Sequence, residues 1–250
     1  MTIDPVFSLG GKRALITGGG SGIGQAVARS LSDAGASITL VGRREALLRD
    51  SLGEREGSVI ATDLLAADAP QTIHDICHDA GSMPDVIVNA AGLNPRKHAD
   101  EVNPEQWQQT IQLNLSIPFF LAQIFVPHMK QKRWGRIINI ASLQSTRAFT
   151  NGIAYGASKG GVSQLTRAMA EAWSKDGINA NAIAPGFFPT ELTAAVFDDD
   201  AVAKHHAAMT CIGRNGELAD LIGPAVFLAS EACNYVTGQI LSVDGGYTAR

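Results

Sequence analysis

Cysteine, aromatic side chains and charge are all scarce in this sequence of 250 residues. The three cysteines, Cys77, Cys211 and Cys233, stand far apart and form neither a zinc-ligand pattern nor a paired disulfide framework. We therefore expect no metal site, and reduced thiols as in cytoplasmic proteins. Aromatic residues are 6% and charged residues 18%, but hydrophobic residues reach 45%, which excludes a disordered chain. The length suits a single α/β domain, residues 1–250.

Positive charge is not in excess, and long apolar runs are missing. The 20 basic and 24 acidic side chains give a net charge of −4, which argues against nucleic acid as a partner. A small anionic substrate stays open, because a pocket needs only one or two local cations. No apolar run approaches the roughly 20 residues of a membrane span. The N-terminal segment, residues 1–13, lacks the basic-then-apolar pattern of a secretory signal, so we expect a cytoplasmic protein without a membrane partner.

Short apolar segments alternate with longer helical patterns along the chain. Their continuous apolar character predicts strands that are buried on both faces, as in a parallel sheet. These segments are residues 13–17, 37–42, 58–63, 85–92, 136–142, 178–186 and 239–246. The helical patterns cover residues 23–34, 104–131, 153–175 and 217–230. The alternation predicts an α/β fold with a doubly wound parallel sheet. The acidic run at 198–200 predicts a solvated loop between short helices, with a lid over the site as a second role.

A glycine-rich turn, TGGGSGIG, follows the first predicted strand and precedes the first predicted helix. It contains Gly18, Ser21, Gly22, Ile23 and Gly24. Its glycines let the backbone turn tightly and approach a pyrophosphate, toward which the helix would direct its free N–H groups. The strand–turn–helix context favours a dinucleotide site over the alternative, a plain connecting loop.

The second predicted strand ends in VGRR, residues 41–44. NAD-binding enzymes usually place an acidic residue here, on the ribose 2′-hydroxyl, but this chain has Gly42 followed by Arg43 and Arg44. Guanidinium groups bind a 2′-phosphate through paired hydrogen bonds, so NADP(H) is favoured and NAD(H) is the alternative. A second interpretation makes both arginines surface charges at the start of a helix.

Asp63 ends the third predicted strand and stands beside Leu64. Its carboxylate suits the amino group of an adenine, so we expect both residues at the adenosine end of the cofactor. The alternative for Asp63 is a helix cap before LLAADA.

The segment AYGASKGG, residues 154–161, places Tyr155 and Lys159 four positions apart among small residues. This spacing puts both side chains on one face of a helix. A neighbouring ammonium group stabilises a phenolate, so we expect Lys159 to lower the pKa of Tyr155 and to make it a general acid/base. The alternative is an ordinary pair of polar side chains on a helix surface.

Together these motifs resemble the short-chain dehydrogenase/reductase family. The matching features, in the family's order, are TGGGSGIG, NAAG at 89–92, Asn114 in LNLS, Ser142 after RIINIAS, Tyr155 with Lys159, and PGFFPT at 185–190. The resemblance extends from residue 8 to the C-terminus. It implies a Rossmann-type domain whose seven-stranded parallel sheet has the order 3-2-1-4-5-6-7. It also implies a homotetramer with the helices at 104–131 and 153–175 in one interface.

The resemblance also implies roles for individual residues. The implied catalytic set is Asn114, Ser142, Tyr155 and Lys159. Asn114 would bend its helix and hold a water molecule that relays protons from Lys159. Further cofactor contacts are implied at Asn89, Ala90, Gly92, Tyr155, Lys159, Pro185, Gly186, Phe188 and Thr190. Pro189 departs from the family pattern and stiffens the loop before Thr190.

Within the family, the segments around Ser142, residues 181–192 and the C-terminal region look most like gluconate 5-dehydrogenases and 2-deoxy-gluconate 3-dehydrogenases. The resemblance implies hydride transfer between NADP(H) and a secondary alcohol or carbonyl of a sugar acid or sugar. Candidate substrate residues are Asn94, Arg96, Ser142, Gln144, Arg147 and Arg250. The amide side chains suit hydroxyl groups, and Arg96 or Arg147 suits a carboxylate, although for either arginine alone a surface charge is the better interpretation. Arg250 is expected to shape the pocket of a neighbouring subunit.

Three other functions fit the same sequence. A 3-oxoacyl-carrier-protein reductase shares the motifs, and Arg96, Lys97 and His98 offer it a basic patch. A sugar 1-dehydrogenase acting on a neutral or anionic sugar is the second alternative. A non-catalytic nucleotide sensor is the third, and the complete set of Ser142, Tyr155 and Lys159 argues against it.

Overall fold

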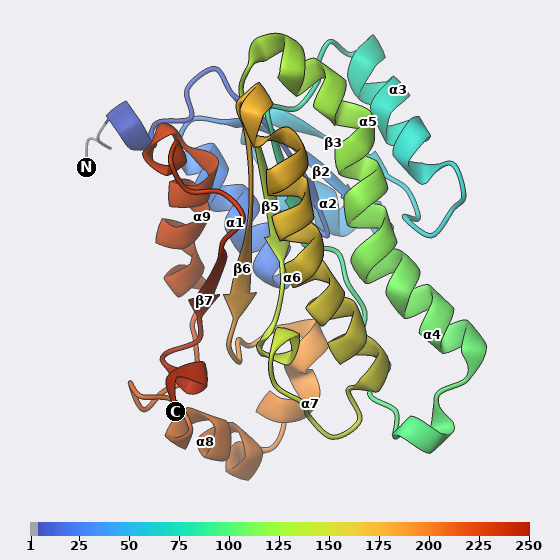
Figure 1. Ribbon diagram of the computed structural model, residues 1–250, viewed down its shortest axis with the longest axis vertical. Coiled ribbons are helices and arrows are strands. Elements are labelled where there is room, and N and C mark those ends of the chain that lie inside the picture. Colours follow the sequence, from blue (N-terminus) through green and yellow to red (C-terminus); the bar gives the residue numbers. More distant parts are fainter. Residues whose placement is uncertain (1–4) are drawn as a thin grey trace.

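A seven-stranded parallel sheet forms the centre of the computed structural model, which describes residues 5–250 (Figure 1). Its order is β3-β2-β1-β4-β5-β6-β7, which confirms the predicted order. Every neighbouring pair of strands is parallel. Residues 1–4, the start of the segment that lacks a secretory pattern, lie outside the described residues.

The strands coincide with the apolar segments of the sequence. They are β1 Arg13–Thr17, β2 Ser37–Gly42, β3 Gly57–Ala61, β4 Val86–Asn89, β5 Gly135–Ile140, β6 Ile178–Pro185 and β7 Ile240–Val243. The first two predicted ranges match in full. The predicted ranges 85–92 and 239–246 ran past the strands, because their last residues belong to the loops that leave the sheet. β5 and β6 are buried along their whole length, as the continuous apolar pattern predicted.

Helices cover both faces of the sheet. They are α1 Gly22–Asp33, α2 Glu45–Leu52, α3 Ala69–Asp79, α4 Pro104–Ile111, α5 Ile117–Lys132, α6 Ile153–Trp173, α7 Ala194–Phe197, α8 Asp200–Ala208 and α9 Ile222–Ala229. The predicted helix at 104–131 is divided by a π-helical turn, Gln112–Ser116. The acidic run lies between the short helices α7 and α8, as predicted: Asp198 and Asp199 connect the two helices and are exposed, and the Asp199 side chain accepts hydrogen bonds from the first N–H groups of α8.

Two hydrophobic clusters hold the layers together. One contains Leu31 of α1 and Leu228 of α9 on one face of the sheet. The other contains Ile73 of α3, Phe125 of α5 and Met169 of α6. Burying each such side chain contributes about 1.5–3 kcal/mol to folding. The clusters therefore fix the sheet, from whose edge the functional loops extend.

One helical run within residues 5–250, Pro104–Lys132, is long enough for a membrane span and contains an 18-residue window with a mean hydropathy of 1.3. Gln112, Asn114 and Gln123 interrupt this helix, so it is not the continuous apolar run that the sequence lacks. Leu121, Phe125 and Met129 of this run are fully buried in the second cluster. The run therefore packs as a core helix of this fold.

Candidate active site

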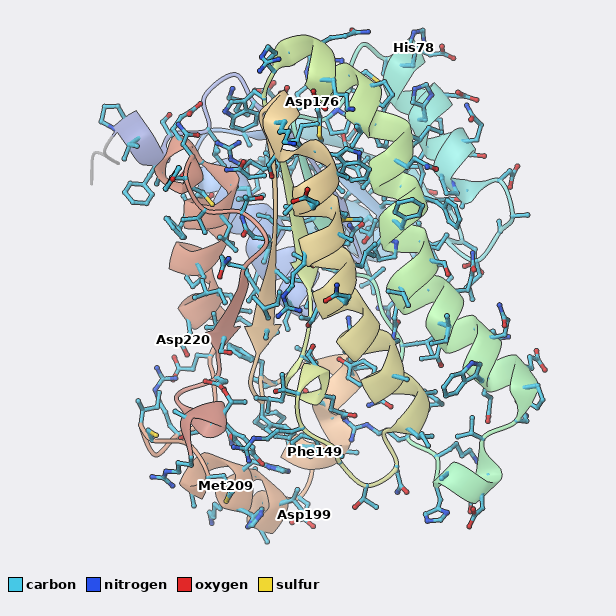
Figure 2. The ribbon with its side chains drawn as sticks, in the orientation of Figure 1. His78, Phe149, Asp176, Asp199, Met209 and Asp220 are labelled. Atoms are coloured by element: carbon cyan, nitrogen blue, oxygen red, sulfur yellow. The ribbon has the colours of Figure 1, made fainter. Side chains whose placement is uncertain are left out.

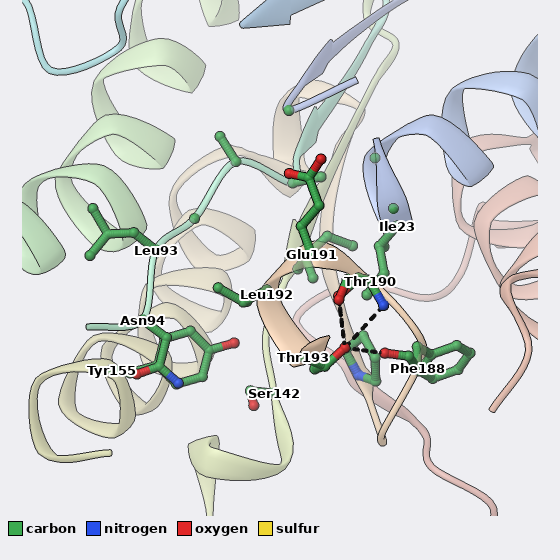
Figure 3. Close-up of a pocket in the computed structure, with 18 of the residues that line it drawn as sticks. Ile23, Leu93, Asn94, Ser142, Tyr155, Phe188, Thr190, Glu191, Leu192 and Thr193 are labelled. Atoms are coloured by element: carbon green, nitrogen blue, oxygen red, sulfur yellow. Dashed lines mark hydrogen bonds between the residues drawn. The ribbon is translucent and has the colours of Figure 1, made fainter. Parts of the chain in front are cut away.

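A cavity of about 940 Å³ lies where the loops after the parallel strands meet. Most of the residues that the sequence predicted for cofactor and substrate line it (Figure 3). They are Gly18, Ser21, Gly22, Ile23, Gly24, Arg43, Arg44, Asp63, Leu64, Ala90, Gly92, Asn94, Arg96, Ser142, Gln144, Tyr155, Lys159, Pro185, Gly186, Phe188 and Thr190. Segments that are far apart in the sequence thus form one continuous site of the size that ligand pockets usually have.

Four predicted residues lie outside the cavity lining. The Asn89 side chain donates a hydrogen bond to Asn139 at 2.8 Å and so joins β4 to β5. Arg147 donates to the backbone oxygen of Arg250, and Arg250 donates to the backbone oxygen of Ala208 at 3.1 Å. These contacts hold the C-terminus beside α8 (Figure 1). Arg147 is therefore tied to its own chain rather than directed into the cavity, and the role of Arg250 toward a neighbouring subunit stays a prediction.

Asn114 is the fourth predicted residue outside the cavity lining, and it holds two segments of the site together. It is 1% exposed and sits in the π-helical turn, so the predicted local distortion of the helix is present. Its side chain accepts a hydrogen bond from the Leu93 N–H and donates to the Leu93 carbonyl oxygen, both at 2.9 Å. It also donates to the Ser158 hydroxyl at 3.0 Å. The amide of Asn114 thereby fixes the loop after β4 against α6.

The glycine-rich turn is built so tightly that only glycine fits at two positions. Gly18 has φ +69°, and a Cβ there would lie 2.9 Å from the Ala91 nitrogen. A Cβ at Gly24 would lie 2.3 Å from the Gly18 carbonyl oxygen. The N-terminus of α1 therefore packs directly on the backbone of the turn and lines the cavity, and its positive dipole end favours an anion there. This cradle fits the pyrophosphate of a dinucleotide.

Asp63 caps a turn rather than the helix that its alternative interpretation required, since α3 begins only at Ala69 with Asp68 at its N-cap. The Asp63 carboxylate accepts a hydrogen bond from the Leu65 N–H at 3.0 Å, which caps the turn after β3. The same residue lines the cavity. The structure thus allows a capping role and a ligand-facing role together.

Tyr155, Lys159 and Ser142 meet at the inner end of the cavity. Tyr155 and Lys159 lie on α6, with the Lys159 nitrogen 5.6 Å from the centre of the Tyr155 ring. Lys159 donates a hydrogen bond to the Ile140 carbonyl oxygen at 2.6 Å, which anchors it against β5. The Ser142 hydroxyl accepts from the Gln144 N–H at 3.1 Å, so the start of the next turn holds it in place.

The expected lowering of the Tyr155 pKa by Lys159 is wrong for this structure. Burial raises the pKa of Tyr155, and the opposing influences are the Ser142 side chain and the charge of Arg96. Burial also lowers the pKa of Lys159 to about 8. Both shifts follow from the cost of holding a charge away from water. Tyr155 is thus a neutral phenol suited to donating a proton, and Arg96 adds a cationic influence that the sequence analysis did not assign to it.

Several cavity residues were missed because no motif marks them. His206 of α8 stacks on Phe187 with ring centres 3.7 Å apart and lies 3.4 Å from the Tyr247 hydroxyl. Burial and the nearby His205 lower the pKa of His206, so its imidazole is neutral at physiological pH. Phe149 lines the same end of the cavity, and Figure 2 shows it in the region of α8. Only the fold brings α8 over this site.

The short segment Glu191–Thr193 also lines the cavity and was not predicted as a ligand contact. Arg44 forms a two-pronged ion pair with Glu191, with nitrogen–oxygen distances of 3.0 and 2.7 Å. Arg96 donates a hydrogen bond to the Leu192 carbonyl oxygen at 2.8 Å. Of the three cavity arginines that were assigned to anionic groups, Arg44 and Arg96 therefore contact this segment.

Within residues 5–250, no group of three or more His, Cys, Asp or Glu side chains is placed to hold a metal ion. Cys77 and Cys233 are buried and Cys211 is exposed, all as free thiols. The candidate proton-transfer groups that line the cavity are the Tyr155 phenol, the Ser142 hydroxyl and the Lys159 ammonium group.

Comparison with known proteins gives matches along nearly the whole chain. A protein-family model described as enoyl-(acyl carrier protein) reductase matches residues 18–248. The 2-dehydro-3-deoxy-D-gluconate 5-dehydrogenase of Bacillus subtilis is 41% identical, over 98% of this chain and 97% of that protein. The gluconate 5-dehydrogenase of Gluconobacter oxydans is 36% identical, over 99% of each. A crystal structure of a gluconate 5-dehydrogenase from Burkholderia cenocepacia, in complex with NADP and tartrate, superposes with a TM-score of 0.93 at 38% identity, covering 98% of both chains.

Proposed function

The chain belongs to the short-chain dehydrogenase/reductase family, and we propose that it transfers a hydride between NADP(H) and a secondary alcohol or carbonyl group of a sugar acid, in the manner of a gluconate 5-dehydrogenase. One observation carries the proposal: a single cavity joins a dinucleotide cradle to Tyr155, Ser142 and Arg96. The relatives named above support the substrate class, and the Burkholderia enzyme's complex supports the cofactor. The proposal takes residues 1–250 as one domain.

The residues that would hold the cofactor fit a phosphorylated dinucleotide. The turn from Gly18 to Gly24 and the N-terminus of α1 suit the pyrophosphate, and Arg43 and Arg44 suit a 2′-phosphate. NAD(H), with a 2′-hydroxyl, is the weaker candidate. When bound, the nicotinamide would accept or supply the hydride, while the protein supplies binding, orientation and proton transfer.

The proton is assigned to Tyr155. In carbonyl reduction its phenol donates a proton to the substrate oxygen, and in alcohol oxidation the phenolate accepts it. The Ser142 hydroxyl would hold that oxygen in place. Arg96 would stabilise the phenolate once it forms, Lys159 would contact the cofactor, and Asn114 would keep α6 and the loop after β4 in register.

The side chains in the outer part of the cavity suit a substrate that carries a carboxylate and several hydroxyl groups. Arg96 is the proposed partner of the carboxylate, because it lines the cavity and acts on Tyr155. Asn94, Gln144 and the neutral imidazole of His206 offer donors and acceptors to hydroxyl groups. The tartrate bound by the Burkholderia enzyme is itself a hydroxylated dicarboxylate.

We further propose a cytoplasmic homotetramer with no nucleic-acid or membrane partner. Exposed apolar side chains on the helices of the expected interface support this assembly. Trp107 is 40%, Phe120 is 47% and Ile153 is 50% exposed. A second subunit packed on these helices would remove them from water.

A substrate panel tests the proposed function. The absorbance of the reduced nicotinamide would be followed while sugar acids, or neutral sugars of equal length, are oxidised with NADP or NAD. A short 3-oxoacyl thioester would be tested in the reverse direction, as a substrate for reduction. We expect the highest kcat/KM for a sugar acid with NADP. Turnover confined to the thioester or to neutral sugars would contradict the substrate class, and tight nucleotide binding without turnover of any compound would favour the sensor.

Replacing Arg43 by aspartate should shift the cofactor preference from NADP toward NAD. The substitution removes a phosphate partner and places a carboxylate directly after Gly42, the position at which NAD-binding enzymes usually carry an acidic residue. We expect the ratio of kcat/KM for NADP over NAD to fall by at least about tenfold, as losing a charged hydrogen bond of 1.5–3 kcal/mol predicts. Arg49→Asp, with the same charge change on the exposed side of α2, is the control. An unchanged ratio would make Arg43 a surface charge.

Replacing Arg96 by glutamine should weaken the binding of sugar acids more than the binding of neutral substrates. We expect KM for gluconate to rise about 10- to 100-fold, because the carboxylate loses a charge-assisted hydrogen bond. KM for the neutral hexitol should change much less. Equal losses for acid and hexitol would show that Arg96 only supports Leu192 and does not recognise the carboxylate.

A further inference from the structure

The Arg44 guanidinium already has an anionic partner in the cavity. It donates to both carboxylate oxygens of Glu191, and its Nη2 also lies 3.3 Å from the Ser21 hydroxyl. All three residues line the cavity. The ion pair therefore joins the end of β2 to the segment after β6, across the part of the site assigned to the adenosine side of the cofactor.

The pair is well formed but easy to replace. The side chains of Arg44 and Glu191 are 57% and 63% exposed, and ion pairs in such surroundings stabilise a protein by about 0–1 kcal/mol. A phosphate group carries about 1.5 to 2 negative charges near pH 7 and accepts the same two-pronged hydrogen bonds. A 2′-phosphate would therefore compete directly with the Glu191 carboxylate for Arg44.

Glu191 cannot move far when it loses this partner, because its backbone belongs to a fixed turn. The Thr193 hydroxyl accepts a hydrogen bond from the Thr190 N–H at 3.0 Å and donates to the Phe188 carbonyl oxygen. Arg96 holds the Leu192 carbonyl oxygen from the substrate side. Figure 3 shows the Glu191 side chain extending away from Ser142 and Tyr155. A displaced carboxylate would thus stay near the bound phosphate, and the two like charges would repel each other.

We propose that Glu191 determines cofactor specificity by competing with the 2′-phosphate of NADP(H) for Arg44. The inference depends on the proposed function, since it concerns the same nucleotide site. NAD(H) carries no 2′-phosphate and leaves the Arg44–Glu191 pair intact. Glu191 therefore reduces the preference for NADP(H) that Arg43 and Arg44 create.

Nucleotide binding to the purified protein, without substrate, tests the inference. The fluorescence of bound NADPH and NADH would be titrated for the wild type and Glu191→Gln, which removes the charge but keeps the shape of an exposed side chain. We expect the Kd for NADPH to fall about 3- to 10-fold, the effect of a surface charge pair near 1 kcal/mol, and the Kd for NADH to change less than about twofold. The difference should shrink in high salt, which screens exposed charges.

Two further variants separate this effect from general changes in charge. Glu45→Gln removes an exposed carboxylate that pairs with Arg49 and should leave both Kd values unchanged. In a protein that already carries Arg44→Gln, Glu191→Gln should no longer lower the Kd for NADPH. The inference would be overturned, with the proposed function intact, if Glu191→Gln tightened the binding of both nucleotides equally, left both Kd values unchanged or weakened NADPH binding. Failure of the wild type to bind either nucleotide would overturn the proposed function as well.

Discussion

Replacing Tyr155 by phenylalanine is expected to lower turnover of the sugar acid by at least about 10²-fold, the scale of general acid–base catalysis. The variant keeps the buried ring in α6 and loses only the hydroxyl that exchanges the proton. No other phenol lines the cavity among the described residues. Ser142 is proposed to position the substrate oxygen, and Lys159 is held by the Ile140 carbonyl oxygen, so we expect neither to take over this proton transfer.

The variant's fold and nucleotide binding should be retained, so the loss belongs to kcat. Thermal unfolding and NADPH titration would check both before the rates are compared. Tyr235→Phe is the matched control, since Tyr235 is fully exposed and outside the cavity lining. Near-normal turnover by Tyr155→Phe would contradict the assignment of the proton to this residue.

Replacing Gly24 by alanine is expected to damage the nucleotide site more than any other single methyl group at the glycine-rich turn. The new Cβ would lie 2.3 Å from the carbonyl oxygen and 2.8 Å from the carbonyl carbon of Gly18, and both are backbone atoms. The turn between β1 and α1 must then move. Overpacking of this kind costs about 1–3 kcal/mol, and the N–H groups of α1 no longer point at the pyrophosphate.

We expect the melting temperature of Gly24→Ala to fall by about 2–4 °C for each kcal/mol lost. NADP should add less to the melting temperature of this variant than to that of the wild type, because its affinity falls by at least about tenfold when 1.4 kcal/mol of binding free energy is lost. Gly223→Ala on α9 is the control, because nothing lies within 4 Å of its added Cβ. A stable Gly24→Ala variant with full NADP affinity would show that the cofactor is not held at this turn.

The fold was largely predictable because each buried strand is a continuous apolar segment. β1 and β2 were predicted to the residue, and the resemblance supplied the order of the sheet. The distortion of the long helix at 104–131 was expected only from the resemblance, at Asn114, because the periodicity of the sequence does not show it. Its π-helical turn depends on Asn114 reaching Leu93 and Ser158, which are distant in sequence.

The candidate site was predictable where a motif lies on one continuous segment. The glycine-rich turn, the arginines after β2 and the Tyr155–Lys159 pair all line the cavity. Glu191 and His206 were missed because their neighbours come from other segments; 147 positions separate Glu191 from Arg44. Arg147 looked equally available for substrate, but its contact with the C-terminus depends on how the chain closes on itself.

The pKa of Tyr155 could not be predicted from spacing either. The four-residue interval places Lys159 nearby, but burial, which the sequence does not display, has the larger effect on both side chains. The positive contribution of Arg96 also requires the loop after β4 to fold back over the cavity. Electrostatics at this site is therefore a property of the packed structure.

The decisive measurement is the mass of the sugar acid formed when a keto sugar acid is reduced with NADPH carrying deuterium at the transferable position. The proposed hydride transfer predicts one deuterium per product molecule, located on the new carbinol carbon. Reduction without deuterium in the product, or NADPH binding with no sugar acid formed, would contradict the proposed reaction.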